Sequence, residues 1–270
     1  MTRVRTIAAA VLAALLGAPV GAAETARQIL DRRKALEDTT RHWHDRYEKM
    51  KFRIVDRRGG ERKRELEVYD IRLGGDEEKT ILFFLAPAEV KGTGFLAFNH
   101  KGRPSDQWLY LPALSRVRQI TAGARRESFV GSDLSYHDLD ILQEMPSWSE
   151  VDAPAQLRGE ETIDGVAAHT IDLSPKREDI GYTRILLWLG KDDLVPRRLE
   201  LYEAADGEPK KRIEQGDVRT VGAIPVAHRV TVATPGVGSR TEIEIADVRF
   251  DKGLEEDDFS QRYLEIGRVD

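Results

Sequence analysis

Apolar and polar residues alternate in many short runs along this chain, and this pattern does most to limit its fold. It is clearest in the runs RELEVYDIRL, RRLELYEA, RVTVAT and TEIEIADVRF. Side chains of a strand point alternately to the two faces of a sheet, so a period of two predicts half-buried antiparallel strands. Turn signals separate the runs, at residues 59–60, 74–76, 101–104, 206–207 and 235–236. We therefore expect a β-meander of about ten strands.

A second kind of strand pattern is apolar on both faces. It occurs in TILFFLAP, GTGFLAF and RILLWLG, and nearly so in QWLYLP. Such strands must be covered on both sides, yet helical patterns are scarce. One lies at the beginning of residues 24–270, one near 135–145 and a short one near 255–260. We infer a mainly β (α+β) fold with a single strongly curved antiparallel sheet, an incomplete barrel. A few helices would cover its open side, together with a partner or an apolar ligand.

The strands that are apolar on both faces supply the expected ligand-binding residues. Gly92 and Gly94 would permit a bulge or tight bend there, which lets a strand curve sharply. We expect a hydrophobic cavity lined by some of the large apolar side chains nearby: Phe83, Leu85, Phe95, Phe98, Trp108, Tyr110 and Trp188. Only one face of each strand can line it, so part of this set belongs to the opposite face. The same residues would equally fill a closed core, and the sequence leaves that alternative open.

The longest interval between strand patterns, roughly residues 112–155, contains a helical pattern of its own. Ser135 and Asp138 have the spacing of a capping box, with aspartate in the reciprocal position. Apolar residues then recur at helical spacing until Pro146 stops the run. Long loops in compact domains usually have a function. We therefore expect a short helix inside a functional segment.

We expect residues 128–145 to form a lid over the open side of the sheet. Gly131 would supply the turn before the helix, and Ser132 and Asp133 would accept hydrogen bonds from turn amides. One short helix makes few contacts, so the lid would have modest stability and would shift to admit a ligand. The expected lid residues are Phe129, Gly131, Ser132, Asp133, Leu134, Tyr136, Leu139 and Leu142.

Motifs for catalysis are missing from the sequence. Neither the nucleophile pattern G-x-S-x-G nor the zinc-enzyme pattern H-E-x-x-H occurs. His42 and His44 lie two residues apart beside arginines, where solvent exposure explains them, although sets of this kind can also build metal sites. Gly92 and Gly94 lack the third glycine and following helix of a dinucleotide site. We expect no catalytic residues, no metal, no cofactor and no enzyme activity.

The first residues have the features of a secretory signal peptide. Two arginines precede the 15-residue run TIAAAVLAALLGAPV, which is shorter than the ~20 residues of a bilayer span. Small residues precede Glu24, so we expect cleavage after Ala23, a signal peptide at 1–23 and a single domain at 24–270. An uncleaved membrane anchor is the alternative. The chain has no cysteine, so disulfides and acylation of a terminal cysteine are not expected.

The charge pattern bears on possible partners. The formal net charge is −5, which disfavours nucleic acid as a partner. Basic residues nevertheless gather around the turn at residues 59–60, at Arg57, Arg58, Arg62, Lys63 and Arg64. Such a hairpin tip is either a solvated turn or a surface that attracts anionic lipid headgroups or an acidic partner.

Three segments carry a resemblance to a known family. PAEVKGTGFL, DQWLYLPALSRVRQI and SFVGSDLSYHDL are similar to hallmark segments of outer-membrane lipoprotein-sorting-like proteins, within the LolA-like periplasmic carrier superfamily. The resemblance implies a curled antiparallel sheet with helices over its open side and an apolar cavity between them. It also implies a link to inner-membrane exporters of the resistance-nodulation-division type.

The sequence and this resemblance together predict a periplasmic carrier. It would bind a lipid or an acylated cargo and work with such an exporter in outer-membrane lipid or lipoprotein trafficking. A periplasmic sensor or regulatory module of the same fold is the alternative, and a hydrolase is disfavoured by the missing motifs.

Overall fold

The computed structural model describes residues 24–267, so the predicted signal peptide at 1–23 lies outside the described residues. Thirteen antiparallel strands form one sheet in the order β6-β5-β4-β3-β2-β1-β13-β12-β11-β10-β9-β8-β7. Their bounds are Asp45–Val55 (β1), Glu61–Gly74 (β2), Glu77–Ala86 (β3), Gly94–His100 (β4), Arg103–Leu111 (β5), Arg116–Gln119 (β6), Ala155–Ile163 (β7), Val166–Leu173 (β8), Arg184–Gly190 (β9), Pro196–Tyr202 (β10), Lys211–Val221 (β11), Ile224–Thr234 (β12) and Ser239–Phe250 (β13). The sheet is not closed, which confirms the predicted incomplete barrel, but it has more strands than the turn signals indicated.

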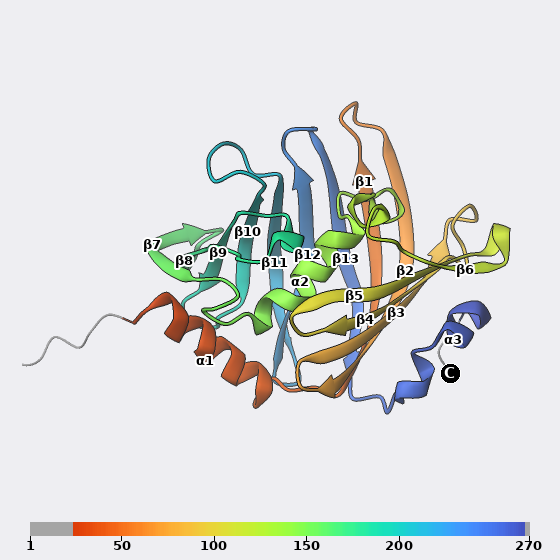
Figure 1. The fold of residues 1–270 in the computed structure, drawn as a ribbon, viewed down its shortest axis with the longest axis horizontal. Coiled ribbons are helices and arrows are strands. Elements are labelled where there is room, and N and C mark those ends of the chain that lie inside the picture. The colour runs from red at the N-terminus through yellow and green to blue at the C-terminus, as the bar shows by residue number, and fades with distance from the viewer. Residues whose placement is uncertain (1–23, 268–270) are drawn as a thin grey trace, which may run out of the picture.

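Strands that are consecutive in the chain are also neighbours in the sheet, except β6 and β7. β1 pairs with β13, the last strand, with Arg46 opposite Phe250 at one end of the register and Val55 opposite Arg240 at the other. β6 and β7 are the two edges. The chain between them, residues 120–154, therefore crosses from one edge to the other, and we call it the crossing segment. It carries α2, which Figure 1 shows in front of the sheet.

Three α-helices accompany the sheet within the described residues: α1 (Ala26–Asp38), α2 (Tyr136–Glu144) and α3 (Gln261–Ile266). Capping boxes begin the first two. The Thr25 amide donates to Gln28 Oε1 at 2.8 Å, and the Ser135 amide donates to Asp138 Oδ2 at 2.8 Å. Each box satisfies amides that a helix N-terminus leaves without partners. The helix predicted from Ser135 and Asp138 is therefore confirmed, as is the helix that opens residues 24–267.

The main core lies between the crossing segment and the inner face of the sheet, the face that α2 covers. Its aromatic centre joins Phe95 of β4 to Phe129 and Tyr136 of the crossing segment, with ring centroids 5.5 to 5.8 Å apart. Edge-to-face and tilted contacts of this kind stabilise beyond the area that they bury. The crossing segment is thus packed onto the sheet by large apolar side chains.

The outer face of β3 to β5 has an apolar cover of its own. Ile81, Phe83 and Leu96 form a second cluster with Phe259 and with Leu264 of α3. A ligand or partner is therefore not needed to cover this face, whereas the extra cover that we inferred from the scarcity of helices concerned the open side of the sheet. The C-terminal residues do so, on the far side from α2 (Figure 1). Gly94 makes the approach possible, because a Cβ there would lie 2.7 Å from Leu264 Cδ1.

We expect Leu264→Ala to lower the free energy of unfolding by about 2 to 4 kcal/mol, because it opens a cavity in the outer cluster. Leu264 is 0% exposed, whereas Ile266 of the same helix is 51% exposed. The matched change Ile266→Ala should therefore cost less than about 1 kcal/mol. Urea denaturation of the two variants makes the comparison. Equal losses would show that α3 does not cover the sheet in this way.

Candidate functional site

A cleft of about 1310 Å³ opens on the inner face of the sheet. Its walls are α1, the beginning of β1, the end of β2 and the last residues of α2, and the turns at residues 194–196 and 224–227 complete it. The volume exceeds the usual range of small-molecule pockets, roughly 300 to 1,000 Å³. It is therefore large enough for an extended ligand.

Apolar side chains form the floor of this cleft. Met50 of β1, Leu142 of α2 and Val230 of β12 are only partly buried, and each packs against the main core from its edge. Ile245 of β13 lies opposite Met50 in the register and also lines the cleft. The floor is thus an apolar surface that adjoins the main core and is open to water. An apolar ligand that bound there would remove this surface from water.

Charged side chains form the wall beside this floor. Residues directly opposite in neighbouring strands share a face, and the registers place Arg46 opposite Asp70 and Arg72 opposite Glu78. The Arg46 Nη2 atom lies 2.8 Å from Asp70 Oδ2, and Arg72 Nε lies 3.7 Å from Glu78 Oε2. Both guanidinium groups also stack on Trp43, with Cζ 4.9 and 3.9 Å from the ring centroid. The carboxylates of the wall are buried, and each is paired with a partly exposed guanidinium group.

Burial changes the protonation of this wall. Removal from water raises the pKa of Glu78 to about 7, and the negative charge of Asp70 adds to the shift. The neighbouring arginines oppose it without cancelling it. Glu78 also accepts a hydrogen bond from the side-chain amide of Gln143 at the end of α2. A group that titrates near neutral pH therefore joins the sheet to the crossing segment.

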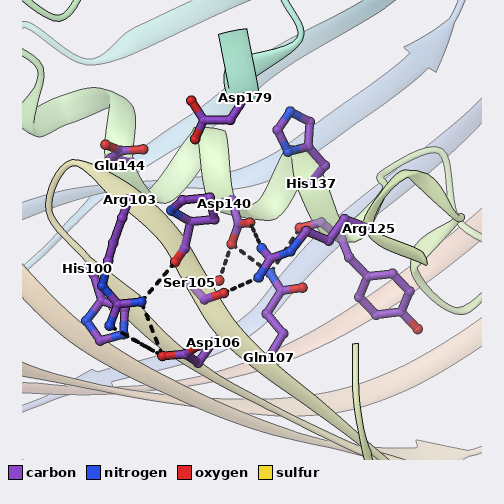
Figure 2. Close-up of polar contacts among 12 residues, drawn as sticks. His100, Arg103, Ser105, Asp106, Gln107, Arg125, His137, Asp140, Glu144 and Asp179 are labelled. Atoms are coloured by element: carbon purple, nitrogen blue, oxygen red, sulfur yellow. Dashed lines mark hydrogen bonds and ion pairs between the residues drawn. The ribbon is translucent and has the colours of Figure 1, made fainter. Parts of the chain in front are cut away.

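A second carboxylate, Asp140, fastens α2 to the sheet. Figure 2 shows it among side chains of β5 and the crossing segment. It accepts hydrogen bonds from the hydroxyl of Ser105, from Arg125, and from Gln107 Nε2 at 2.7 Å. Burial raises the pKa of Asp140, whereas these donors act against the shift. Buried carboxylates that are fully paired hold their elements in one geometry.

A third carboxylate, Asp133, fastens the other part of the crossing segment. It accepts hydrogen bonds from the hydroxyls of Thr234, Ser239 and Thr241 at 2.8, 2.5 and 2.9 Å. Our expectation that this carboxylate bonds turn amides was wrong, because hydroxyls of β12 and β13 lie in reach of it. Gly131 has φ +78° in the turn before α2, which is the conformation that glycine adopts without strain.

The seven predicted ligand-binding residues do not line this cleft. Phe83, Phe98, Trp108 and Tyr110 belong to the outer cluster, and Trp188 lies in a separate small cluster with Ile163 and Ala168. Phe95 is buried under the crossing segment, and Leu85 of β3 is partly buried. Of the predicted lid residues, Leu142 lines the cleft. The structure therefore does not bring the predicted set together around one cavity.

Sequence reasoning missed the residues of the cleft itself, although a signal for them exists. Residues 46, 48 and 50 lie on the same face of β1 as Phe52, which is in the main core. Two of these positions are charged, which breaks the apolar pattern expected for an inner face.

Within residues 24–267, no three His, Asp or Glu side chains are placed to hold a metal ion. No helix in that range is both long and apolar enough to cross a membrane.

The raised pKa of Glu78 predicts a stability that falls as the pH rises. The folded chain keeps this proton up to a pH of about 7, whereas the unfolded chain loses it near the ordinary pKa of 4.5. The free energy of unfolding should therefore decrease across this window by about 3 kcal/mol. We expect Glu78→Gln to lose that dependence and to be more stable than wild type near pH ~8. Denaturation of both proteins across the window measures the effect, with exposed Glu77→Gln as the control; identical profiles for wild type and Glu78→Gln would contradict it.

Solved structures of other proteins share this fold. A protein domain described as outer membrane lipoprotein-sorting, from Vibrio parahaemolyticus, is 27% identical with a TM-score of 0.77, over 87% of this chain and 97% of its own. A DUF1329 family protein from Desulfovibrio piger is 27% identical with a TM-score of 0.80, over 89% and 100%. A LolA superfamily protein from Nitrosomonas europaea is 18% identical with a TM-score of 0.64, over 89% and 100%, and shows the shared fold.

A family model with the description "Uncharacterized protein" matches residues 76–266. No curated protein matches the sequence. None of the three structure descriptions names an enzyme. The chain therefore belongs to the family that this model defines, and it is similar to an outer-membrane lipoprotein-sorting domain and shares the fold of a LolA superfamily protein.

Proposed function

We propose that this protein is a periplasmic carrier that binds a lipid or an acylated molecule in the cleft of the inner face. The observation that carries the proposal is the apolar floor, in which Met50, Leu142 and Val230 extend the main core into open space. Each CH₂ group that such a surface buries contributes about 0.8 kcal/mol. An acyl chain would therefore bind without any covalent step.

The family and the first residues of the chain support the rest of this proposal. One structural relative is described as outer membrane lipoprotein-sorting and another as a LolA superfamily protein. The signal-like residues 1–23 fit export to the periplasm, and residues 24–270 would then act as one domain. We propose an inner-membrane exporter of the resistance-nodulation-division type as the partner that loads or receives the ligand.

The polar groups near the cleft support binding better than catalysis. Ser105 is the hydroxyl closest to an acidic partner there, and it donates to Asp140. That carboxylate also accepts from Arg125 and Gln107, so three donors already hold it and it is committed to positioning. A serine nucleophile needs a free base that takes its proton. The arrangement instead explains how α2 is held over the sheet.

We expect Val230→Trp to weaken lipid binding at least about tenfold, because the larger side chain fills the floor and removes apolar area that the ligand would bury. Val151 lies outside the cleft and is 84% exposed, so Val151→Trp is the matched control and should bind like wild type. Fluorescence titration with a pyrene-labelled fatty alcohol, a neutral probe, measures both affinities. Thermal unfolding verifies that each variant is folded. Unchanged binding by a folded Val230→Trp protein would contradict the proposed site.

A further inference from the structure

Glu48 is a buried carboxylate on the cleft wall whose hydrogen-bonding capacity is unused. It is only 4% exposed, and it lines the cleft. Within residues 24–267 no donor makes a hydrogen bond to it, and its one ion-pair contact is Arg46 Nε at 3.8 Å. Buried charges are normally paired and hydrogen-bonded, because desolvation without a partner is costly. The Glu48 oxygens are not among the fully enclosed polar atoms that lack a partner, so they are open to the cleft and can accept a hydrogen bond from a ligand there.

Arg46 does not fill this role, because it is committed elsewhere. Its Nε and Nη2 atoms donate to Asp70 Oδ2 at 3.0 and 2.8 Å. Arg72, the other arginine of the wall, pairs with Glu78. The wall thus sets two guanidinium groups against three carboxylates. Glu48 is the carboxylate of the wall whose nearest guanidinium group, that of Arg46 at 3.8 Å, makes its hydrogen bonds to another carboxylate.

The surroundings of Glu48 fit a cation that carries an apolar chain. Met50, two residues further along the same face of β1, belongs to the apolar floor. Burial raises the pKa of Glu48, and Asp70 adds to the shift, whereas Arg46 and His228 act against it. A second cation beside this carboxylate would favour its charged form. An ammonium group could thus lie at Glu48 while its chain lies on the floor.

We propose that Glu48 accepts a hydrogen bond from the protonated amine of an amphiphilic ligand, so that the cleft selects amine-bearing lipids over neutral or anionic ones. This inference rests on the proposed lipid-binding function and names the headgroup class. A charge-assisted hydrogen bond in a desolvated site is stronger than a neutral one. A fatty acid would instead bring a second negative charge toward Glu48, which like-charge repulsion disfavours.

The test compares two probes of equal chain length, dodecylamine and N-acetyldodecylamine, which differ in the charge on nitrogen. Calorimetric titration of the wild-type protein at neutral pH should show at least about tenfold tighter binding of the amine, which corresponds to ~1.4 kcal/mol. Glu48→Gln should bind both probes with the affinity that wild type has for the neutral one. Glu244→Gln, on the exposed side of β13, is the control and should keep the preference.

The outcomes separate this inference from the function on which it rests. Equal affinity of wild type for the two probes, or a preference that survives in folded Glu48→Gln, would overturn the role of Glu48 while the lipid carrier stands. If wild type binds neither probe nor the neutral fatty alcohol, the proposed function itself fails. Should Glu48→Gln not fold, the wild-type comparison of the two probes still decides.

Discussion

The pairing of β1 with β13 determines how the rest of this structure is arranged. Because the first and last strands meet in the middle of the sheet, the two edges, β6 and β7, come from the middle of the chain. The 35 or so residues between these edges must then travel across the sheet. The crossing segment is therefore a topological consequence, and it provides both the cover of the core and one wall of the cleft.

Buried carboxylates hold the crossing segment in place. Asp133 joins it to β12 and β13, Asp140 joins it to β5, and Gln143 joins it to Glu78 of β3. An apolar contact tolerates sliding, whereas a satisfied buried polar network specifies one geometry. That residues 128–145 act as a lid that shifts to admit a ligand stays a prediction.

The inner face is divided into an apolar and a charged part, and this division is the basis of the functional proposal. The part under the crossing segment is closed by aromatic side chains such as Phe95 and Phe129. The part beside α1 is open, with an apolar floor next to the wall of Arg46, Glu48 and Glu78. An amphiphile has the same two parts, a chain that leaves water and a headgroup that needs a polar partner. The cleft therefore suits a ligand of this kind better than a wholly apolar one.

The sequence predicted the fold more completely than the site, for physical reasons. Alternation, turns and the two capping boxes are local, so the curled sheet, α1 and α2 could be inferred from neighbouring residues. The element that covers Phe83 and Trp108 cannot be predicted from neighbouring residues, because α3 is far from them in the sequence. The sequence therefore led us to expect these large apolar residues in a cavity, whereas in the structure other parts of the protein cover them. Glu48 was overlooked because a charged residue in an alternating strand is usually taken to face water.

Native mass spectrometry of the protein purified from the periplasm tests the central claim most directly. If the cleft carries a lipid or acylated molecule, gentle desorption should reveal the folded chain with an adduct of lipid mass, and extraction with organic solvent should remove that adduct. Val230→Trp should lack it. A bare mass for the wild-type protein, together with lipid-free extracts, would contradict the account.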